Sequence, residues 1–129
     1  MTSPHPTEGE LAILQVLWDR QSPCTVREVH EALSHHKETA YTTVLKMMTI
    51  MADKGLLQRD ESERSHRYSA LHPEPEVQSV LVKDLMQRAF AGSALQLVQR
   101  ALDVDQPSRA ELDAIAQLIA DAKAKRGKR

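Results

Sequence analysis

Residues 40–54 place the strongest constraint on the fold, because they form a helical pattern with two unlike faces that stops at a glycine. One face is apolar at the helical repeat of about 3.6 residues, and it comprises Val44, Met47, Met48 and Met51. The opposite face is polar and comprises Thr42, Lys46, Thr49 and Asp53. Lys54 directly before Gly55 is typical of a helix C-terminus, where glycine takes the left-handed conformation. We therefore expect a helix that packs with one face and leaves the other free for binding.

The segment after Gly55 predicts two short strands joined by a polar loop. Residues 56–59 and 66–69 form the expected strands, and no Asn-Gly or Asp-Gly pair marks a tight two-residue turn between them. Arg64 and Arg67 are placed at or beside the tip of this hairpin, where guanidinium groups can reach phosphate or a narrow minor groove. A solvated hairpin with ordinary surface charges is the alternative interpretation.

Two capping boxes precede this segment and predict two further helices. In a capping box, a Thr hydroxyl and a Glu carboxylate satisfy free backbone N–H groups at the start of a helix. The two boxes are Thr7 with Glu10 and Thr25 with Glu28. They predict helices over residues 8–20 and 26–34, with a turn at residues 35–39.

Three helices followed by a hairpin are the layout of a winged helix-turn-helix, whose second motif helix enters the DNA major groove. We predict that residues 1–72 form such a domain and that residues 40–54 are the recognition helix. The predicted fold class is mostly α with a small β-hairpin wing.

Net charge argues against strong phosphate binding, because 17 lysines and arginines face 18 aspartates and glutamates. The local pattern is more favourable, since Lys46 is the one charged residue between Thr39 and Ala52. One Trp, two Tyr and one Phe are too few to build a platform that stacks single-stranded bases. Double-stranded DNA is therefore the expected partner, bound with strong salt sensitivity.

The C-terminal part follows a pair of prolines and carries three amphipathic helical patterns, with a break at Gly92. Their apolar stripes have no sheet or core of their own to cover, so we predict a helical dimerisation domain over residues 73–125. The predicted dimerisation residues are Val77, Leu81, Leu85, Leu95, Val98, Leu112, Ile115 and Ile119. A monomeric bundle folded back on the winged domain is the alternative. Residues 126–129 are predicted as a basic tail, part of a disordered end that begins at Lys123.

Several motifs resemble those of the penicillinase-repressor family of the BlaI/MecI/CopY type. They are Ala40-Tyr41-Thr42-Thr43-Val44, Lys54-Gly55-Leu56-Leu57, Arg64-Ser65-His66-Arg67-Tyr68, Ile13-Leu14-Gln15-Val16-Leu17-Trp18, Thr25-Val26-Arg27-Glu28-Val29 and Phe90-Ala91-Gly92-Ser93. The resemblance covers nearly the whole chain. It implies a homodimeric winged-helix repressor that occupies an inverted-repeat, palindromic operator.

The resemblance also implies functional residues. Thr42, Thr43 and Lys46 become the contacts in the major groove, while Tyr41 and Arg64 become phosphate or sugar contacts. These residue types suit such roles, because Thr offers a hydroxyl or a methyl to base edges and Lys donates to guanine or phosphate. The complete DNA-binding prediction comprises Tyr41, Thr42, Thr43, Lys46, Thr49, Arg64 and Arg67. A merely solvated helix face is the alternative.

Three features depart from the family pattern. Ile50 stands where many relatives carry an arginine, and we favour a packing role over contact with a thymine methyl. Some relatives are inactivated by cleavage between Asn and Phe, whereas the corresponding pair here is Arg100-Ala101, so an upstream sensor protease is left open. The paired C-terminal cysteines of copper-responsive relatives are absent from the sequence.

No enzyme, cofactor or metal site is predicted. Cys24 with His30, His35 and His36 lacks the spacing of a metal site, since adjacent histidines diverge in direction. Cys24 also lacks a base with an orienting acid, and the isolated glycines form no phosphate-binding loop. The sequence contains no apolar run of transmembrane length, and residues 1–6 lack the regions of a signal peptide. We expect a cytoplasmic protein that does not bind membranes directly.

Two alternative functions are kept. A winged-helix module for protein–protein contacts is favoured by the acidic balance of the chain. A metal- or ligand-responsive regulator is the second alternative, although no polar cluster in the C-terminal helices specifies a ligand.

Overall fold

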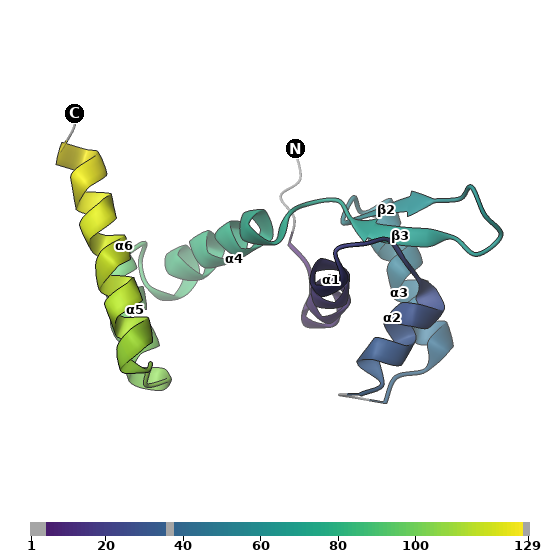
Figure 1. Ribbon diagram of the computed structural model, residues 1–129, viewed down its shortest axis with the longest axis horizontal. Coiled ribbons are helices and arrows are strands. Elements are labelled where there is room, and N and C mark those ends of the chain that lie inside the picture. The colour runs from purple at the N-terminus through teal and green to yellow at the C-terminus, as the bar shows by residue number, and fades with distance from the viewer. Residues whose placement is uncertain (1–4, 36–37, 128–129) are drawn as a thin grey trace. The chain divides into compact units, whose positions relative to one another are not determined.

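The computed structural model describes residues 5–35 and 38–127 (Figure 1). It divides the chain into two compact units, residues 1–84 and 85–129. The division lies inside helix α4 (Glu74–Ala89). The predicted boundary between residues 72 and 73 lies at the start of this helix, and it stays a prediction about the roles of the two parts. Helices with one small antiparallel sheet confirm the predicted fold class.

Three helices of the first unit begin and end within one residue of the predicted positions. They are α1 (Glu8–Arg20), α2 (Val26–Leu33) and α3 (Tyr41–Asp53). Both capping boxes are present. The Glu10 and Glu28 backbone N–H groups each donate to a Thr hydroxyl at 3.2 Å, and the Thr7 and Thr25 N–H groups donate back to the Glu carboxylates at 2.9 and 2.8 Å. α3 stops before Gly55, whose φ of 84° is the predicted left-handed conformation.

The sheet has three strands, one more than predicted. β2 (Leu57–Asp60) and β3 (Arg67–Ala70) form the expected hairpin, and β1 (Cys24–Thr25) pairs with the other edge of β3. All pairs are antiparallel, and Tyr68 faces Cys24 on one side and Arg59 on the other. β1 was missed because two residues cannot show the alternation by which strands are recognised.

The core of the first unit lies between the three helices and the sheet. Its buried members are Ile13, Leu14, Leu17, Cys24, Val26, Val29, Val44, Met48, Met51, Leu56, Leu57 and Tyr68. Val44, Met48 and Met51 of α3 are each 0% exposed, which confirms the predicted inner face, and Met47 packs against the core from its edge. Each such side chain contributes about 1.5–3 kcal/mol when fully buried. This inner face therefore fixes which side of α3 points outward.

The second unit contains the end of α4 and the helices α5 (Ala94–Val104) and α6 (Arg109–Gly127). The predicted break after α4 is confirmed, because Ala91 and Gly92 have φ values of 51° and 78°. Ser93 caps α5 by accepting a hydrogen bond from the Gln96 N–H at 3.1 Å. Ser108 does the same for the Glu111 N–H at the start of α6, also at 3.1 Å.

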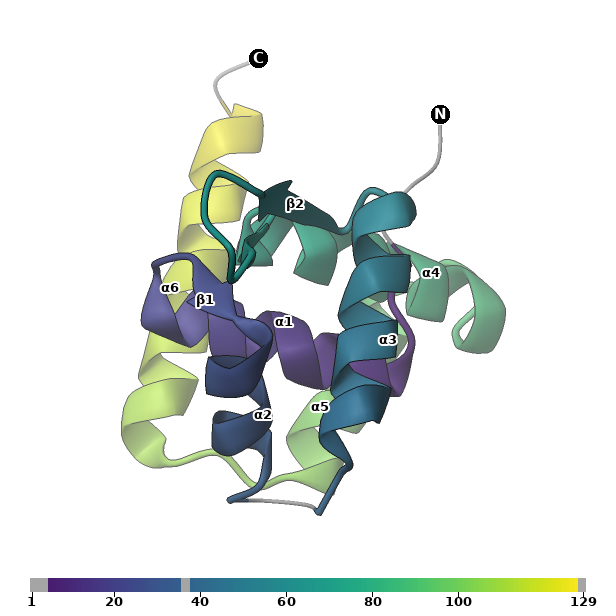
Figure 2. The same cartoon turned by 90° about the vertical axis from the view of Figure 1, so that its right-hand side faces the viewer.

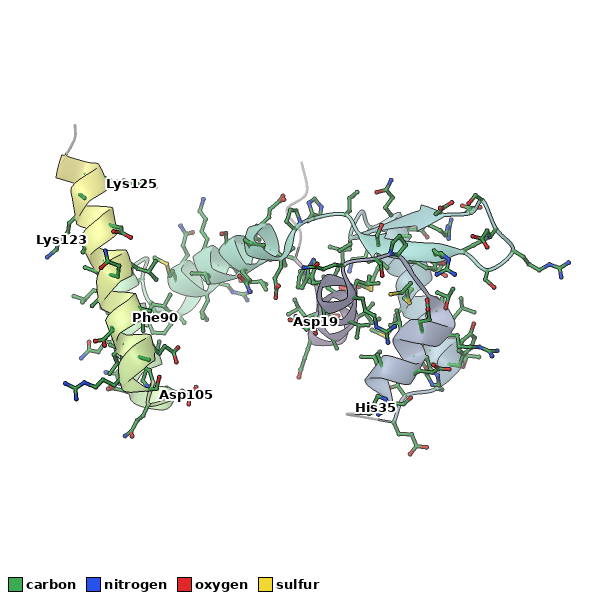
Figure 3. The ribbon with its side chains drawn as sticks, viewed as in Figure 1. Asp19, His35, Phe90, Asp105, Lys123 and Lys125 are labelled. Carbon is green, nitrogen blue, oxygen red and sulfur yellow. The ribbon has the colours of Figure 1, made fainter. Side chains whose placement is uncertain are left out.

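Helix α6 is longer than predicted. The sequence from Lys123 onward was expected to be disordered, but residues 123–127 continue the helix, and Lys123 and Lys125 are side chains on it (Figure 3). Alanine, lysine and arginine are good helix formers, and cations near a helix C-terminus interact favourably with its dipole. The expected disorder is thus wrong for residues 123–127, whereas the basic tail at residues 126–129 stays a prediction and residues 128–129 lie outside the described part.

Helices α5 and α6 contain no buried residue within the part that the structure describes. The large apolar side chains of the second unit that are exposed are Leu85 (47%), Leu95 (78%), Val98 (41%), Val104 (83%), Leu112 (43%), Leu118 (67%) and Ile119 (50%). Amphipathic helices normally cover such stripes by packing. The second unit therefore lacks the closed core that the first unit has.

Candidate nucleic-acid interface

The outward face of α3 is the best candidate for a binding surface in the first unit. α3 lies beside α2 (Figure 2) and packs against α2 and β2. With its inner face in the core, α3 leaves Thr42 and Lys46 exposed on the opposite side. Thr43 is exposed on the flank of the helix, where it lines a pocket together with Ile13 and Met47. The arrangement places a hydroxyl-rich helix face with one cation at the surface, which suits the edges of bases in a major groove. The sequence grouped these three residues on one helix, and the structure gives all three an exposed position.

Two other residues of α3, Thr49 and Ile50, also bear on the predicted DNA contact. Thr49, predicted to contact DNA, is half-buried, and its Oγ1 donates a hydrogen bond to the Leu45 carbonyl at 2.9 Å. This local bond occupies the hydroxyl proton, so Thr49 offers its methyl group more readily than its donor. Ile50 is 43% exposed, and its packing at a domain seam stays a prediction.

The start of α3 is held by a contact that the sequence did not reveal. His30 Nε2 lies 2.7 Å from the Thr39 carbonyl oxygen, and the His30 ring meets the Tyr41 ring edge-on with centroids 5.7 Å apart. Ala40 at the N-cap has no side chain that could hold the first turn. The histidine on α2 thereby restrains Thr39 and Tyr41, the first residue of α3. These contacts join His30 to residues nine and eleven positions further along the chain, and no short-range sequence pattern predicts them.

The far end of α3 is tied to α1 by an ion pair. Lys54 Nζ donates to both carboxylate oxygens of Glu10, at 3.0 and 2.9 Å. Burial by itself raises the pKa of Glu10, but hydrogen bonds from Lys54 and from the Thr7 backbone outweigh it, so the pKa of Glu10 is lowered. Glu10 also belongs to the capping box of α1. One carboxylate therefore links the start of α1 to the end of α3.

The wing presents its arginines in different ways. Arg64 is exposed in the loop between β2 and β3, as predicted. Arg67 is the first residue of β3, and its Nη1 lies 3.5 Å from Glu28 Oε1. Arg59 in β2 pairs with Glu61 at 3.0 Å. Of the two arginines predicted to contact DNA, Arg64 is thus the one at the surface of the loop, while Arg67 braces the sheet against α2.

The predicted dimerisation residues fall into two groups. Val77 is 1% exposed in the single chain, so in this conformation other parts of the same chain cover it, and its role in dimerisation stays a prediction. Val77 follows the helical stripe of α4, but periodicity does not tell which neighbour covers a stripe. The remaining residues are half-buried or exposed: Leu81, Leu85, Leu95, Val98, Leu112, Ile115 and Ile119.

Cys24 and the histidines near it in sequence lie in different surroundings. Over residues 5–35 and 38–127, no group of three or more His, Cys, Asp or Glu side chains is arranged to hold a metal ion. His35 is exposed, and His36 lies outside the described residues. Cys24 is buried, and burial raises the pKa of its thiol. The described helices include none that is long and apolar enough to span a membrane.

Comparison with solved structures supports the fold. BlaI of Bacillus licheniformis, in its monomeric form in complex with the blaP half-operator, matches with a TM-score of 0.50 and 24% identity, over 58% of this chain and 90% of that chain. RosR of H. salinarum matches with a TM-score of 0.52 and 16% identity, over 96% of this chain and 99% of that chain. At these identities, the likeness shows a shared fold.

Comparison by sequence identifies the family. The penicillinase repressor family matches residues 6–121. The transcriptional regulator BlaI of Mycobacterium tuberculosis is 34% identical over 120 residues, which cover 93% of this chain and 86% of that protein. Both matches extend through the winged unit and most of the C-terminal helices. The chain therefore belongs to the penicillinase repressor family, whose members are transcriptional regulators and not enzymes.

Proposed function

We propose that this protein is a transcriptional repressor that inserts α3 into the major groove of an operator in double-stranded DNA. One observation carries the proposal: Thr42, Thr43 and Lys46 are exposed on a helix whose opposite face is buried and whose two ends are held by His30 and Glu10. A rigidly mounted helix with an exposed polar face is what direct readout of bases requires. Arg64 would add a backbone contact from the wing.

We further propose that the repressor is a homodimer on an inverted repeat and that it acts in the cytoplasm, where its DNA target is found. A single recognition helix reads only a few base pairs, whereas a two-fold dimer places two helices about one duplex turn apart. The exposed apolar side chains of the second unit, including Leu95, Leu112 and Ile119, suit a surface that a second copy covers. A sensor protease is not part of the proposal, because Arg100-Ala101 departs from the family cleavage pair and lies within α5.

Selection of bound sites from a random pool of duplex DNA tests the DNA-binding part. We expect enrichment of an inverted repeat, and weaker binding to it by Thr43→Ala and Lys46→Ala variants that remain folded. Lys83→Ala is the matched control, since Lys83 is an exposed lysine on α4. If both α3 variants bind the selected site as tightly as the wild type, the assignment of α3 is wrong. Retention of a protein partner independent of salt, with no DNA bound, would favour an interaction module instead.

Sedimentation equilibrium at micromolar concentration tests the dimer. The expected species has twice the mass of the 14.5 kDa chain. Ile119→Lys should shift the equilibrium towards the monomer, because the substitution places a charge in the proposed apolar interface. Arg109→Gln serves as a control at an exposed polar position of the same helix. A sample that contains only the 14.5 kDa species rejects the dimer.

A further inference from the structure

A second polar surface lies next to the recognition helix. A groove of about 500 Å³ opens where the start of α2, the start of α3 and the wing meet. Its lining residues are Thr25, Val26, Arg27, Tyr41, Leu45, Arg64, Ser65, His66 and Tyr68. The basic residues of this lining are Arg27, Arg64 and His66, and the lining includes no Asp or Glu. In a chain with a net charge of −1, this is a local concentration of positive charge.

The two arginines of the groove differ from their neighbours in lacking an acidic partner. Arg59 pairs with Glu61, and Arg67 pairs with Glu28. Arg27 and Arg64 are both exposed and form no ion pair with any residue of the segments 5–35 and 38–127. The acid nearest to Arg27 along the chain is Glu28, which is already engaged by Arg67 and by the Thr25 N–H. The guanidinium groups of the groove are therefore available to an external anion.

The position of the groove favours the DNA backbone as that anion. A helix with its side chains is about 10–12 Å wide, close to the width of roughly 12 Å of the major groove. Groups that flank an inserted helix consequently meet the sugar–phosphate strands. Tyr41 belongs both to α3 and to the lining of the groove, so the groove borders the face that we propose to read bases.

We propose that this groove binds the phosphates of one DNA strand, with Arg27 and Arg64 each neutralising one phosphate. The inference rests on the proposed function, because an inserted α3 is what brings the backbone to the groove. It extends the DNA contact to α2, where sequence analysis had assigned no contact. Guanidinium suits this role, since its planar set of donors matches phosphate oxygens. These contacts set affinity and the position of the protein on DNA and carry no sequence information.

The salt dependence of DNA affinity tests the proposal. Affinity is measured by fluorescence anisotropy between 50 and 200 mM salt, on a random-sequence duplex of about 30 base pairs and on the selected operator. Arg27→Gln should lower the slope of log affinity against log salt by about 0.9 per bound protomer, with roughly five- to tenfold weaker binding near 0.1 M salt. The loss should be equal on both duplexes. Arg27→Lys should retain the slope, because the charge remains.

Further variants separate a local contact from a general loss of charge. Arg109→Gln removes the same charge from an exposed position in α6 and should leave the slope unchanged. Arg27→Gln combined with Arg64→Gln should lose the sum of the two single effects, since the two contacts are separate phosphates. The circular dichroism of each variant should equal that of the wild type, because both arginines are exposed.

The outcomes that overturn the proposal are distinct from those that overturn the proposed function. A wild-type slope and affinity for Arg27→Gln removes Arg27 from the interface while DNA binding stands. A loss on the operator but not on the random duplex makes Arg27 a base contact, which also overturns the phosphate site. Failure of the wild-type protein to bind either duplex rejects the proposed function itself, and the groove with it.

Discussion

The two units of this chain are built from similar amphipathic helices, yet they bury very different amounts of apolar surface. Among the described residues, every buried apolar side chain, from Ile13 to Val77, belongs to the first unit. In the second unit, Leu95 is 78% exposed and Val104 is 83% exposed. The first unit closes its core because three helices and a sheet surround it, whereas the second unit buries no residue within its described part. Helical periodicity alone does not distinguish these two cases.

The difference teaches that the units obtain their stability from different sources. A buried Leu or Met in the first unit contributes within one chain, at about 25 cal/mol for each Å² removed from water. The same residue type in the second unit contributes only when another surface covers it. The first unit should therefore behave as a self-contained fold, and the second should depend on association.

The largest expected effect contrasts a core leucine with an exposed one. Leu14→Ala should lower the free energy of unfolding of the first unit by about 3 kcal/mol, because it leaves a cavity at a side chain that is 1% exposed. Leu95→Ala should change the unfolding of the monomer by less than about 0.5 kcal/mol. Urea titration followed by Trp18 fluorescence for the first unit, and by circular dichroism for all helices, measures both. Equal losses of unfolding free energy for the two variants would contradict the proposed difference between the two units.

The second-largest expected effect on stability contrasts a partly buried ion pair with an exposed one. Glu10→Gln should cost about 2 kcal/mol, between the values for exposed and buried pairs, because Glu10 is buried and holds both Lys54 and the α1 cap. Asp103→Asn should cost almost nothing, since the Arg100–Asp103 pair in α5 is more than half exposed on both sides. Urea titration at pH 7 gives both values. A larger cost for Asp103→Asn would contradict the expected contrast.

The Glu10 pair also makes the stability of the first unit depend on pH. The pKa of Glu10 is lowered from its ordinary value near 4.5, so the folded state binds the proton more weakly than the unfolded state. Its contribution is present above this value and is lost as the pH falls through the lower pKa of the folded state. Glu10→Gln should flatten that part of the stability profile. A profile between pH 5 and 2 that is the same for variant and wild type would exclude this role.

A further test of the difference between the two units varies the protein concentration. If a second copy covers the second unit, a tenfold increase in concentration should stabilise its helices by up to about 1.4 kcal/mol. The midpoint followed by circular dichroism should then rise with concentration, while the midpoint followed by Trp18 fluorescence should stay constant. Thermal melts at several concentrations between 1 and 100 μM, roughly spanning the range for such dimers, measure this. Constant midpoints for both signals would mean that the second unit is stable by itself.

The smallest expected effect on stability comes from removing the side chains that cap two helices. Thr7→Ala and Ser93→Ala each remove a hydroxyl that accepts from a backbone N–H, at 3.2 and 3.1 Å. Each should cost about 1 kcal/mol locally. The Thr7 loss should appear in the Trp18 transition, and the Ser93 loss only in the helical signal of the second unit. Serine at position 7 is the control, because Thr7→Ser keeps the capping hydroxyl. Loss of Trp18-monitored stability in Ser93→Ala would show that the two units unfold together.

The first unit could be predicted from the sequence almost element by element. Capping residues, helical repeats and the Lys54-Gly55 stop act over a few neighbouring positions, so they are visible without a structure. Contacts across the fold are not visible in this way. The pairing of β1 with β3, the hydrogen bond from His30 to the Thr39 carbonyl and the burial of Val77 each join residues whose proximity depends on tertiary packing.

The candidate site shows the same limit. Thr42 and Lys46 share the polar helix face, so their grouping could be predicted from periodicity, whereas Thr43 was named only through the family resemblance. The groove that contains Arg27 and Arg64 could not, because it is assembled from a helix, a second helix and a hairpin loop that are distant in sequence. Whether an arginine is paired or free is also a tertiary property, as the contrast between Arg64 and Arg67 illustrates.

The middle position of β3 in the sheet determines where the fold tolerates changes in sequence and length. A strand with neighbours on both edges cannot slip in register without disrupting both ladders, so β2 and β3 stay aligned whatever joins them. Residues 61–66 lie between the two strands and outside every pairing. This loop can therefore be lengthened, shortened or exchanged with little effect on the scaffold. Figure 1 shows this loop at the end of the hairpin formed by β2 and β3, so exchanging it between relatives would alter the proposed phosphate contact of Arg64 and leave the strands in place.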